Sequence, residues 1–326
     1  MTPELGGYFG LELPDNGDIF SGAVKFQSGR AALHAVLESA RVRRVLLPAY
    51  ICDSVIQAIT DAGAAFEYHS LDDSLYPTGL PSSLPRASAV LYVNYFGLCD
   101  ANVGPLMQEV SHNQLIIDNA HALLAPPTDS LATIYSPRKF VGVPGGGMLV
   151  TSDLEIEVPD REDVGSLARV KHLLIRLAYT AKDGYPEYVD SEASLSDTAP
   201  LRMSRLSSRL LAAVDFKAVG EKRQANFAAL ASRLDKHNTL KWSLEKQATP
   251  LRYPLVLDVD VLALKKHLAE KGVYIPTYWR ECKTRVKSHV ESRLTECCLP
   301  IPCDQRYSCE QVTEVAVRVV TALAAG

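Results

Sequence analysis

The chain has 326 residues, of which 47% are hydrophobic and 22% are charged, a composition typical of a folded globular protein. This length predicts one large domain or two moderate ones. The net charge is only −4, which argues against a broad basic surface for nucleic acid, because binding to a phosphate backbone needs clustered lysine and arginine. We therefore expect no nucleic-acid partner.

The location of the protein is predicted from its apolar and cysteine patterns. No stretch approaches the roughly 20 apolar residues that span a bilayer, so we expect no membrane segment. The first 20 residues carry four acidic residues and no lysine or arginine, unlike a secretory signal, which begins with a basic segment. The seven cysteines form no Cys-x-x-Cys motif, which favours reduced thiols in a cytoplasmic protein. Four of them lie within 297–309, but their spacing matches no standard zinc site, and we expect no metal.

The N-terminal half of the chain alternates between amphipathic and continuously apolar segments. Helices are predicted over 30–41, 51–62 and about 102–111 from apolar residues that recur at helical spacing. Short apolar runs predict strands at 45–47, 66–71, 89–93, 115–117, 133–135 and 148–151. Runs that are apolar throughout are typical of strands buried on both faces. We therefore expect an α/β fold with a mostly parallel sheet between helices.

The pattern changes near residue 160. Helices are predicted over 165–182, 203–235, 259–271 and 309–324, and strands or apolar stretches at 253–257, 273–275 and 299–301. The polar segment 183–200 contains Pro186 and Pro200 and is interpreted as a loop. We expect an N-terminal arm (1–25), a large domain (26–215) and a smaller C-terminal α+β domain (216–326), with a site in the cleft between the two domains.

Two features suited to an anion and a cation fall where such sheets bind ligands, beyond the carboxyl ends of the strands. Ser28-Gly29-Arg30 opens the first helix, whose free N–H groups and dipole suit a phosphate, although an ordinary helix cap is the alternative. Asp118 directly follows a buried strand, where a carboxylate needs a cationic partner. A protonated pyridine nitrogen would serve; alternatively, Asp118 caps the next turn.

Two further features suit a carbonyl compound. His121, three residues after Asp118, can hydrogen-bond a ligand hydroxyl or have a structural role. Lys139 lies in a tight loop between two expected strands, where loss of hydration lowers the pKa of its amine and frees it to attack a carbonyl. A solvated loop lysine is the alternative. Ser136, three residues before Lys139, can bind the same anion as Ser28.

Anion cradle, acid, histidine and loop lysine occur in an order that resembles the fold-type I pyridoxal phosphate (PLP) enzymes. The chain most closely resembles the DegT/StrS family of sugar aminotransferases. The motifs of this resemblance are SGRAAL (28–33), the segment 46–72, VNYFG (93–97), IIDNAHA (116–122), SPRKFVGVPGGGMLVT (136–151), LRMSRLSSRLLAAVD (201–215), EKRQANFAAL (221–230), YIPTYW (274–279) and LPIPCDQRYSCEQV (299–312). Their shared order and spacing are far more specific than any one of them.

The resemblance implies a role for each matching residue. Lys139 would hold PLP as an internal aldimine and then act as general acid and base. Asp118 would keep the pyridine nitrogen protonated, and His121 falls where the family has a glutamine near the cofactor's phenolic oxygen. The phosphate would be held by Ser28, Gly29, Arg30 (through its backbone N–H) and Ser136.

Several positions depart from the family pattern. The aromatic residue that stacks on the cofactor ring falls on Cys52, and Tyr50 or Tyr95 is expected to compensate. Asn94 stands where the family has a histidine and is kept among the expected cofactor contacts. Pro200 replaces an asparagine that, in the family, reaches the phosphate across a dimer interface.

The function implied by the resemblance is a PLP-dependent aminotransferase. An amino donor, by family likeness glutamate, would give its amino group to a keto group of a nucleotide-linked deoxysugar, in a cytoplasmic homodimer. Two alternatives remain: another PLP enzyme, a dehydratase or lyase, and a non-catalytic PLP-binding regulatory protein. In family dehydratases a histidine replaces the lysine, so Lys139 argues against that variant. The chain is short between 151 and 200, where such enzymes often bind substrate, which leaves the sugar open.

Overall fold

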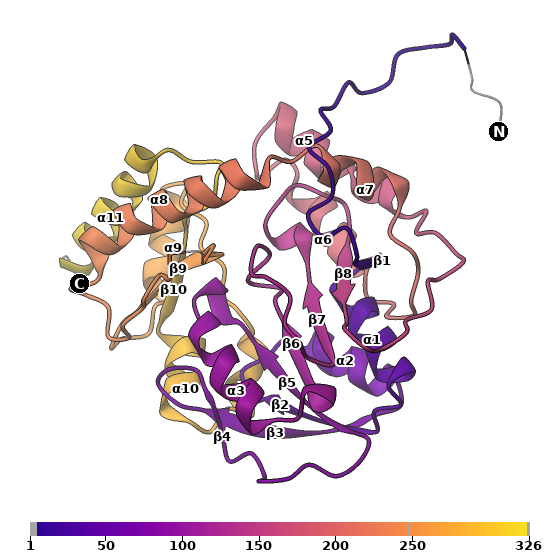
Figure 1. Ribbon diagram of the computed structural model, residues 1–326. Coiled ribbons are helices and arrows are strands. Elements are labelled where there is room, and N and C mark those ends of the chain that lie inside the picture. Colours follow the sequence, from indigo (N-terminus) through magenta and orange to yellow (C-terminus); the bar gives the residue numbers. More distant parts are fainter. Residues whose placement is uncertain (1–4, 247, 325–326) are drawn as a thin grey trace.

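The structure is a computed structural model that describes residues 5–246 and 248–324. Its main feature is an eight-stranded sheet flanked by helices, with a smaller two-stranded sheet beside it (Figure 1). The strands of the large sheet are β1 (Val24–Phe26), β2 (Arg44–Pro48), β3 (Ala65–Leu71), β4 (Pro77–Thr78), β5 (Ser88–Val93), β6 (Leu115–Asp118), β7 (Ala132–Tyr135) and β8 (Gly147–Val150). Their order across the sheet is β1-β8-β7-β6-β5-β2-β3-β4.

The central strands of this sheet are buried along their whole length. Every residue of β5 and of β7 is buried, which is possible only where both faces of the sheet are covered. The strands β7, β6, β5, β2 and β3 run parallel, whereas the pairs β1–β8, β7–β8 and β3–β4 are antiparallel. The expected mostly parallel sheet is therefore confirmed.

The strand order creates a natural ligand site. Strand β2 lies between β3 and β5, so the chain builds the sheet outward from this point in two directions. In open α/β sheets, ligands bind outside the carboxyl ends of the strands at such a reversal. The residues that follow β2, β5, β6 and β7 therefore meet at one edge of the sheet.

Helices cover the large sheet. Helix α1 (Gly29–Ser39) packs against β1, β7 and β8, and beside it lies α2 (Asp53–Asp61). The other helices of this part are α3 (Val103–Glu109), α4 (Ser166–Arg169), α5 (Lys171–Ala178), α6 (Tyr185–Ala193) and α7 (Arg205–Ala212). Short 3₁₀ turns occur at η1 (Tyr95–Gly97), η2 (Asp100–Asn102), η3 (His112–Gln114), η4 (Pro137–Lys139) and η5 (Arg280–Thr284).

The C-terminal part is reached through α8 (Phe216–Leu234), the long helix across the top of Figure 1. It contains an antiparallel pair, β9 (Arg252–Val256) and β10 (Cys298–Pro302), with α9 (Leu262–Glu270), α10 (His289–Glu296) and α11 (Cys309–Ala324). One apolar core runs from Leu47 in the large sheet to Leu299 in the small one. Boundaries at residues 25 and 215 stay predictions.

Several predicted elements differ from the structure. The helix expected over 203–235 is two helices, because the side chain of Asp215 caps a new one by accepting from the Ala218 N–H (2.9 Å). The helix expected over 165–182 is likewise divided into α4 and α5. The strand expected at 273–275 is absent from the described structure, since β9 pairs only with β10 there.

The segment 183–200 is not only a loop, as was predicted. It contains α6, and Pro186 lies in the first turn of that helix, where the missing N–H of proline costs nothing. Strand β1 and helix α10 were not predicted at all.

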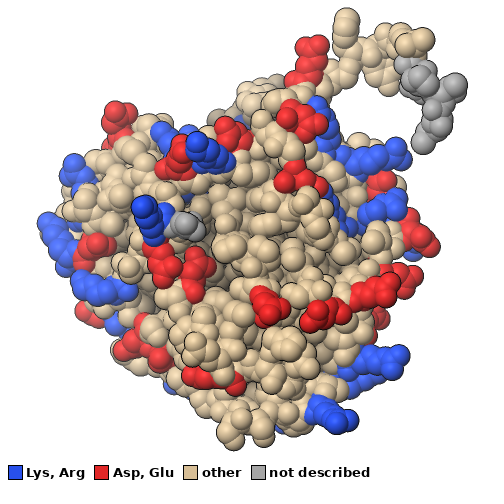
Figure 2. All heavy atoms as spheres, viewed as in Figure 1, with Lys and Arg blue, Asp and Glu red and all other residues tan. Residues whose placement is uncertain are grey.

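The N-terminal arm leaves the body of the molecule (Figure 1). Tyr8 and Phe9 are almost fully exposed. The following residues contact the body, where Arg209 donates to the Leu13 carbonyl (2.6 Å), Asn16 donates to the Ala212 carbonyl (2.7 Å) and Phe20 packs on Tyr135. No helix in the described part of the chain is long and apolar enough to cross a membrane. On the face shown in Figure 2, the described lysines and arginines are interspersed with acidic residues and form no continuous basic stripe.

Candidate functional site

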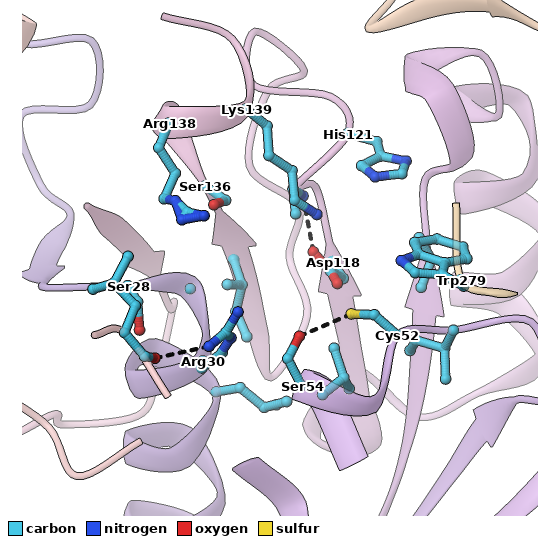
Figure 3. A pocket seen from close by; sticks show the side chains of 18 of the residues that line it. Ser28, Arg30, Cys52, Ser54, Asp118, His121, Ser136, Arg138, Lys139 and Trp279 are labelled. Atoms are coloured by element: carbon cyan, nitrogen blue, oxygen red, sulfur yellow. Dashed lines mark hydrogen bonds between the residues drawn. The ribbon is translucent and has the colours of Figure 1, made fainter. Parts of the chain in front are cut away.

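A cavity of about 210 Å³ lies at the carboxyl edge of the large sheet and extends to the C-terminal part. Its lining includes the predicted residues Ser28, Gly29, Arg30, Cys52, Asp118, His121, Ser136 and Lys139. The structure thus brings together eight of the ten residues predicted from sequence, and Figure 3 shows all of these except Gly29 around one space.

The N-terminus of α1 forms one end of the cavity. The Ser28 hydroxyl accepts a hydrogen bond from the Ala31 N–H (3.2 Å), so Ser28 is the helix cap. A Cβ atom at Gly29 would lie 3.6 Å from the Cβ of Ser136, in the space between the helix and the lysine loop. Backbone N–H groups and the Ser136 hydroxyl therefore border a space that a side chain at residue 29 would fill.

Gly147 explains why the lysine loop lies against this helix. A Cβ atom at Gly147 would lie 2.1 Å from the carbonyl oxygen of Ser28, which is a steric clash. Only glycine, which has no Cβ atom, fits at this position. The neighbouring residue, Gly146, forms a bridge with Ser28 and donates its N–H to the Gln27 carbonyl (2.7 Å). The glycine-rich loop predicted from sequence thus allows close backbone approach at the site.

Asp118 ends β6 at the floor of the cavity. Burial raises the pKa of its carboxyl group, whereas the positive charge of Lys139 and the Ala120 N–H (2.8 Å) both lower it. The net direction is upward, so the charged carboxylate is not fully compensated by the protein. A cationic ligand group opposite Asp118 would provide the missing compensation.

Lys139 closes the turn η4, and its side chain extends toward Asp118 (Figure 3). The expectation that this lysine is poorly hydrated is wrong for this structure, because its side chain is exposed at the cavity mouth. The Lys139 N–H donates to the Ser136 carbonyl (3.2 Å), which closes the turn that carries the side chain.

His121 lies on the opposite side of the cavity from α1. Its ring is buried, with only 1% of its surface exposed, and burial lowers the pKa of the imidazole well below its usual value. Nδ1 accepts the Phe96 N–H (3.4 Å), which places the proton of the neutral ring on Nε2. Within the described structure, Nε2 has no partner. The ring therefore has one unused N–H donor at the cavity.

Trp279 comes from the C-terminal part and was missed as a site residue. Its ring stacks on His121, with centroids 5.4 Å apart and planes 11° apart, and it lines the cavity. Its backbone is left-handed (φ 53°), which is unusual for a bulky residue and is often found at functional sites. The YIPTYW motif contained this residue, but sequence alone does not reveal a left-handed conformation.

Two predicted cofactor contacts do not line the cavity. Tyr50 is fully buried, and its carbonyl accepts from the Tyr95 hydroxyl (2.7 Å). Asn94 is buried in a network in which it donates to Asp100 and accepts the Cys99 N–H (3.1 Å). Both side chains are buried in the core, outside the cavity lining.

Cys52 does line the cavity, with its Sγ 3.0 Å from the Ser54 Oγ. Tyr50 and Tyr95, which were expected to supply an aromatic face in its place, stack on each other with centroids 5.6 Å apart and do not reach the cavity. Aromatic side chains reach the cavity from the C-terminal part instead: Trp279, which is shown in Figure 3, and its neighbour Tyr278.

Three charged groups gather at the α1 end of the cavity: Arg30, Arg138 and Glu192. Arg138 pairs with Glu192, and Arg30 donates to the Leu195 carbonyl (2.8 Å). Burial lowers the pKa of Arg30, and the nearby charge of Arg138 lowers it further. Neither Arg138 nor Glu192 was predicted as a site residue. Glu192 was missed because it belongs to the segment 183–200, which was interpreted as a loop.

Comparison with known proteins places this fold. No protein-family model and no curated protein matches the sequence. Among solved structures, the aminotransferase TlmJ from Streptoalloteichus hindustanus matches 93% of this chain and 86% of its own, with 20% identity and a TM-score of 0.64. A DegT/DnrJ/EryC1/StrS aminotransferase from Brucella abortus matches 92% of this chain and 85% of its own (14% identity, TM-score 0.61).

A third structure is a GDP-4-keto-6-deoxymannose-3-dehydratase with a trapped PLP–glutamate geminal diamine. It matches 91% of this chain and 88% of its own, with 14% identity and a TM-score of 0.64. At these identities the likeness establishes the fold alone, which this chain shares with the two aminotransferases and with the PLP-bound dehydratase.

Proposed function

We propose that the protein is a PLP-dependent aminotransferase that moves an amino group, from glutamate, to a keto group of a nucleotide-linked deoxysugar. One observation carries the proposal: a single cavity holds the Lys139 amine and the Asp118 carboxylate on the fold of PLP-dependent enzymes. Neither residue alone is specific, whereas the pair on this fold matches the two reactive ends of PLP, an aldehyde and a pyridine nitrogen.

The residues present fit the cofactor. The phosphate would take the open N–H groups of α1 and the Ser136 hydroxyl, in the space that Gly29 leaves free. The pyridine nitrogen would face Asp118, whose pKa is raised by burial in spite of the opposing charge of Lys139, so a second cationic group beside it would be favourable. The phenolic oxygen would accept the unused Nε2–H of His121, and Lys139 Nζ would be the covalent attachment point.

The chemistry divides between the cofactor and the chain. PLP, when bound, supplies an electron sink for the negative charge left when a substrate carbon loses its proton. Asp118 would keep the proton on the ring nitrogen by charge attraction. The amine of Lys139 would move the substrate proton between neighbouring atoms, as a positioned acid and base does. Trp279 and His121 would exclude water from one side.

The substrates are proposed from the relatives. The matched dehydratase acts on a nucleotide-linked keto sugar and was solved with glutamate attached to PLP. A large substrate such as a nucleotide-linked sugar needs an open path to the reactive amine. Lys139 is exposed in the described chain, which supports such a path.

A dehydratase is the second candidate, since one matched structure is such an enzyme. Lys139 favours transamination, because the family resemblance gives dehydratases a histidine at this position. A non-catalytic PLP-binding protein is the third candidate, and it rests on the departures at Cys52 and Pro200.

A homodimer and a cytoplasmic location complete the proposal. Large apolar side chains are exposed on and around α4, α5 and α6: Val164, Leu167, Leu174, Leu177, Tyr179, Tyr185, Tyr188 and Val189. Helix α6 also supplies Glu192 to the cavity, so a second subunit on this face would adjoin the site. All seven cysteines are free thiols, which suits a reducing compartment.

The test is covalent capture of the cofactor. Protein with added PLP should become yellow, and borohydride should fix one PLP per chain. Lys139→Ala should abolish this adduct, whereas Lys236→Ala, at an exposed position outside the cavity, should retain it. Glutamate should then remove the yellow band and release 2-oxoglutarate. Protein that stays colourless with added PLP contradicts the proposal. A yellow band that glutamate leaves unchanged, with no 2-oxoglutarate released, contradicts transamination from glutamate.

A further inference from the structure

We propose that the guanidinium groups of Arg30 and Arg138 bind a phosphate monoester dianion at the α1 end of the cavity. Under the proposed function, on which this inference rests, that dianion is the PLP phosphate. The sequence resemblance assigns Arg30 only a backbone contact and gives Arg138 no role.

Both side chains are positioned for this task. Arg30 is the second residue of α1, and Arg138 lies in the turn η4 between Ser136 and Lys139. Both line the cavity, and Figure 3 shows the Arg138 guanidinium close to Ser136, with that of Arg30 directed into the same space. A ligand held by Ser136 would therefore lie within reach of both.

The charges at this end do not balance. Two guanidinium groups face one carboxylate, Glu192, which pairs with Arg138. Arg30 has only a neutral partner in the hydrogen bonds of the described structure, the Leu195 carbonyl. The α1 dipole adds further positive potential at the same place. An excess of half-buried positive charge is unfavourable without an anion, and the lowered pKa of Arg30 reflects that cost.

The chemical class of the ligand follows from the donors. Guanidinium groups present paired N–H donors that match the oxygens of a phosphate, and an anion with two charges suits two arginines better than a carboxylate does. Helix N–H groups and the Ser136 hydroxyl would bind the remaining oxygens.

The chain also needs such donors because Pro200 has none. Where the resemblance places an asparagine that reaches a phosphate from the other subunit, proline offers no side-chain hydrogen bond. The backbone around it is engaged elsewhere, since Gln27 donates to the Ala199 carbonyl (2.7 Å) and accepts the Leu201 N–H (2.8 Å). The two arginines would therefore replace a contact between subunits by contacts within one subunit.

The experiment compares a ligand with and without phosphate. Cofactor-free protein is titrated with PLP and with pyridoxal, and each dissociation constant is measured by equilibrium dialysis. The variants are Arg30→Gln, Arg138→Gln and the double variant. Arg233→Gln, an exposed position on α8 outside the cavity, is the matched control. Each single variant should weaken PLP binding by about tenfold or more, as expected for a lost hydrogen bond to a charged group, and change pyridoxal binding by less than about twofold.

Inorganic phosphate provides a second measurement. It should compete with PLP in the unsubstituted protein and lose most of this effect in the double variant. Where a glutamine variant does not fold, Arg30→Lys and Arg138→Lys take its place. These variants should weaken PLP binding by less than about tenfold and leave pyridoxal binding unchanged, because lysine keeps the charge but lacks the paired donors.

Three outcomes overturn the inference. PLP binding that is unchanged in the double variant shows that the arginines do not contact the phosphate. Equal weakening of PLP and pyridoxal shows a general effect on the cavity. Both leave the proposed function standing. Unsubstituted protein that binds neither PLP nor pyridoxal overturns the proposed function and this inference together.

Discussion

The guanidinium group of Arg223 donates a hydrogen bond to the carbonyl oxygen of Phe140, the residue after Lys139 (3.0 Å). Arg223 belongs to α8 and is buried, with its charge 4.5 Å from the centre of the Phe140 ring. It also donates to the carbonyls of Pro250 and Leu251 (3.0 and 3.1 Å). One side chain from the connecting helix thus fixes the backbone that carries the lysine.

Replacing Arg223 should therefore affect stability and cofactor capture together. Burial lowers the pKa of this guanidinium to about 10, because removing its charge from water is unfavourable. The hydrogen bonds to the three carbonyls offset that cost. We expect Arg223→Lys to lower the free energy of unfolding by about 2–4 kcal/mol, because lysine cannot reach these carbonyls at once. Urea denaturation measures the loss, with Arg233→Lys as the control. A loss no larger than that of the control contradicts this role.

Asp118→Asn should stabilise the cofactor-free protein and inactivate the enzyme. The pKa of Asp118 is raised by burial, so ionisation costs folding energy that is absent below the unfolded pKa of about 3.9 and fully present above the folded pKa. The variant should be more stable near pH 7, and the difference should disappear toward pH 4. Turnover should fall by about a hundredfold or more, since asparagine cannot hold a proton on the ring nitrogen by charge.

Unfolding measured against pH, with and without PLP, tests this prediction. The stability gain should shrink or reverse once PLP is bound, because the cationic nitrogen then stabilises the Asp118 carboxylate. A variant that is less stable than the original at pH 7 without PLP contradicts the argument.

His121→Gln should reduce the dependence of stability on acid. The pKa of His121 is lowered by burial, so its neutral form is favoured in the folded state. Its contribution is complete above the unfolded pKa of about 6.5 and is lost as the pH falls toward the folded pKa. The original protein should lose stability from about pH 6.5 downward more steeply than the variant. Burial also lowers the pKa of His69. Because His69 is present in both proteins, its contribution to the acid dependence cancels in the comparison.

Glutamine also keeps an N–H donor, so PLP binding should survive in His121→Gln. In His121→Leu it should weaken by about tenfold, because the phenolic oxygen loses its partner. Equal affinities in the two variants would show that this donor does not contact the cofactor.

Gly147→Ala should disturb the anion end of the cavity. The added methyl group would lie 2.1 Å from the Ser28 carbonyl oxygen, so the strand or the helix must move. We expect a loss of more than about 2 kcal/mol in unfolding free energy and weaker PLP binding. Gly104→Ala on α3 is the matched control, since no heavy atom lies within 4 Å of its added methyl group. That change should leave PLP binding unaltered, and equal effects of the two would contradict the steric argument.

The sequence predicted the parallel sheet and most of the cavity because both depend on local patterns. Asp118 is the last residue of β6, and Lys139 lies in the turn η4 that follows β7. Residues that follow neighbouring parallel strands lie at the same edge of a sheet. Side-chain direction was harder to predict. Tyr50 and Cys52 are two residues apart, yet the first faces the core and the second faces the cavity.

The other differences between prediction and structure arose where one residue type is common in two structural settings. Pro186 was interpreted as a loop signal, but proline also begins helices, and the missed helix α6 contributes Glu192 to the site. Lys139 was expected to be poorly hydrated, but the exposure of a loop side chain depends on what covers the loop, which no local pattern records.

Trp279 gives the protein its own optical probe. The chain contains only two tryptophans, and the other, Trp242, does not line the cavity. An indole in contact with the site loses emission when an acceptor that absorbs in the near ultraviolet binds beside it. Cofactor binding and its release in every variant above can thus be followed by intrinsic fluorescence, without an attached dye, with Trp279→Phe as the reference that reports the emission of Trp242 alone.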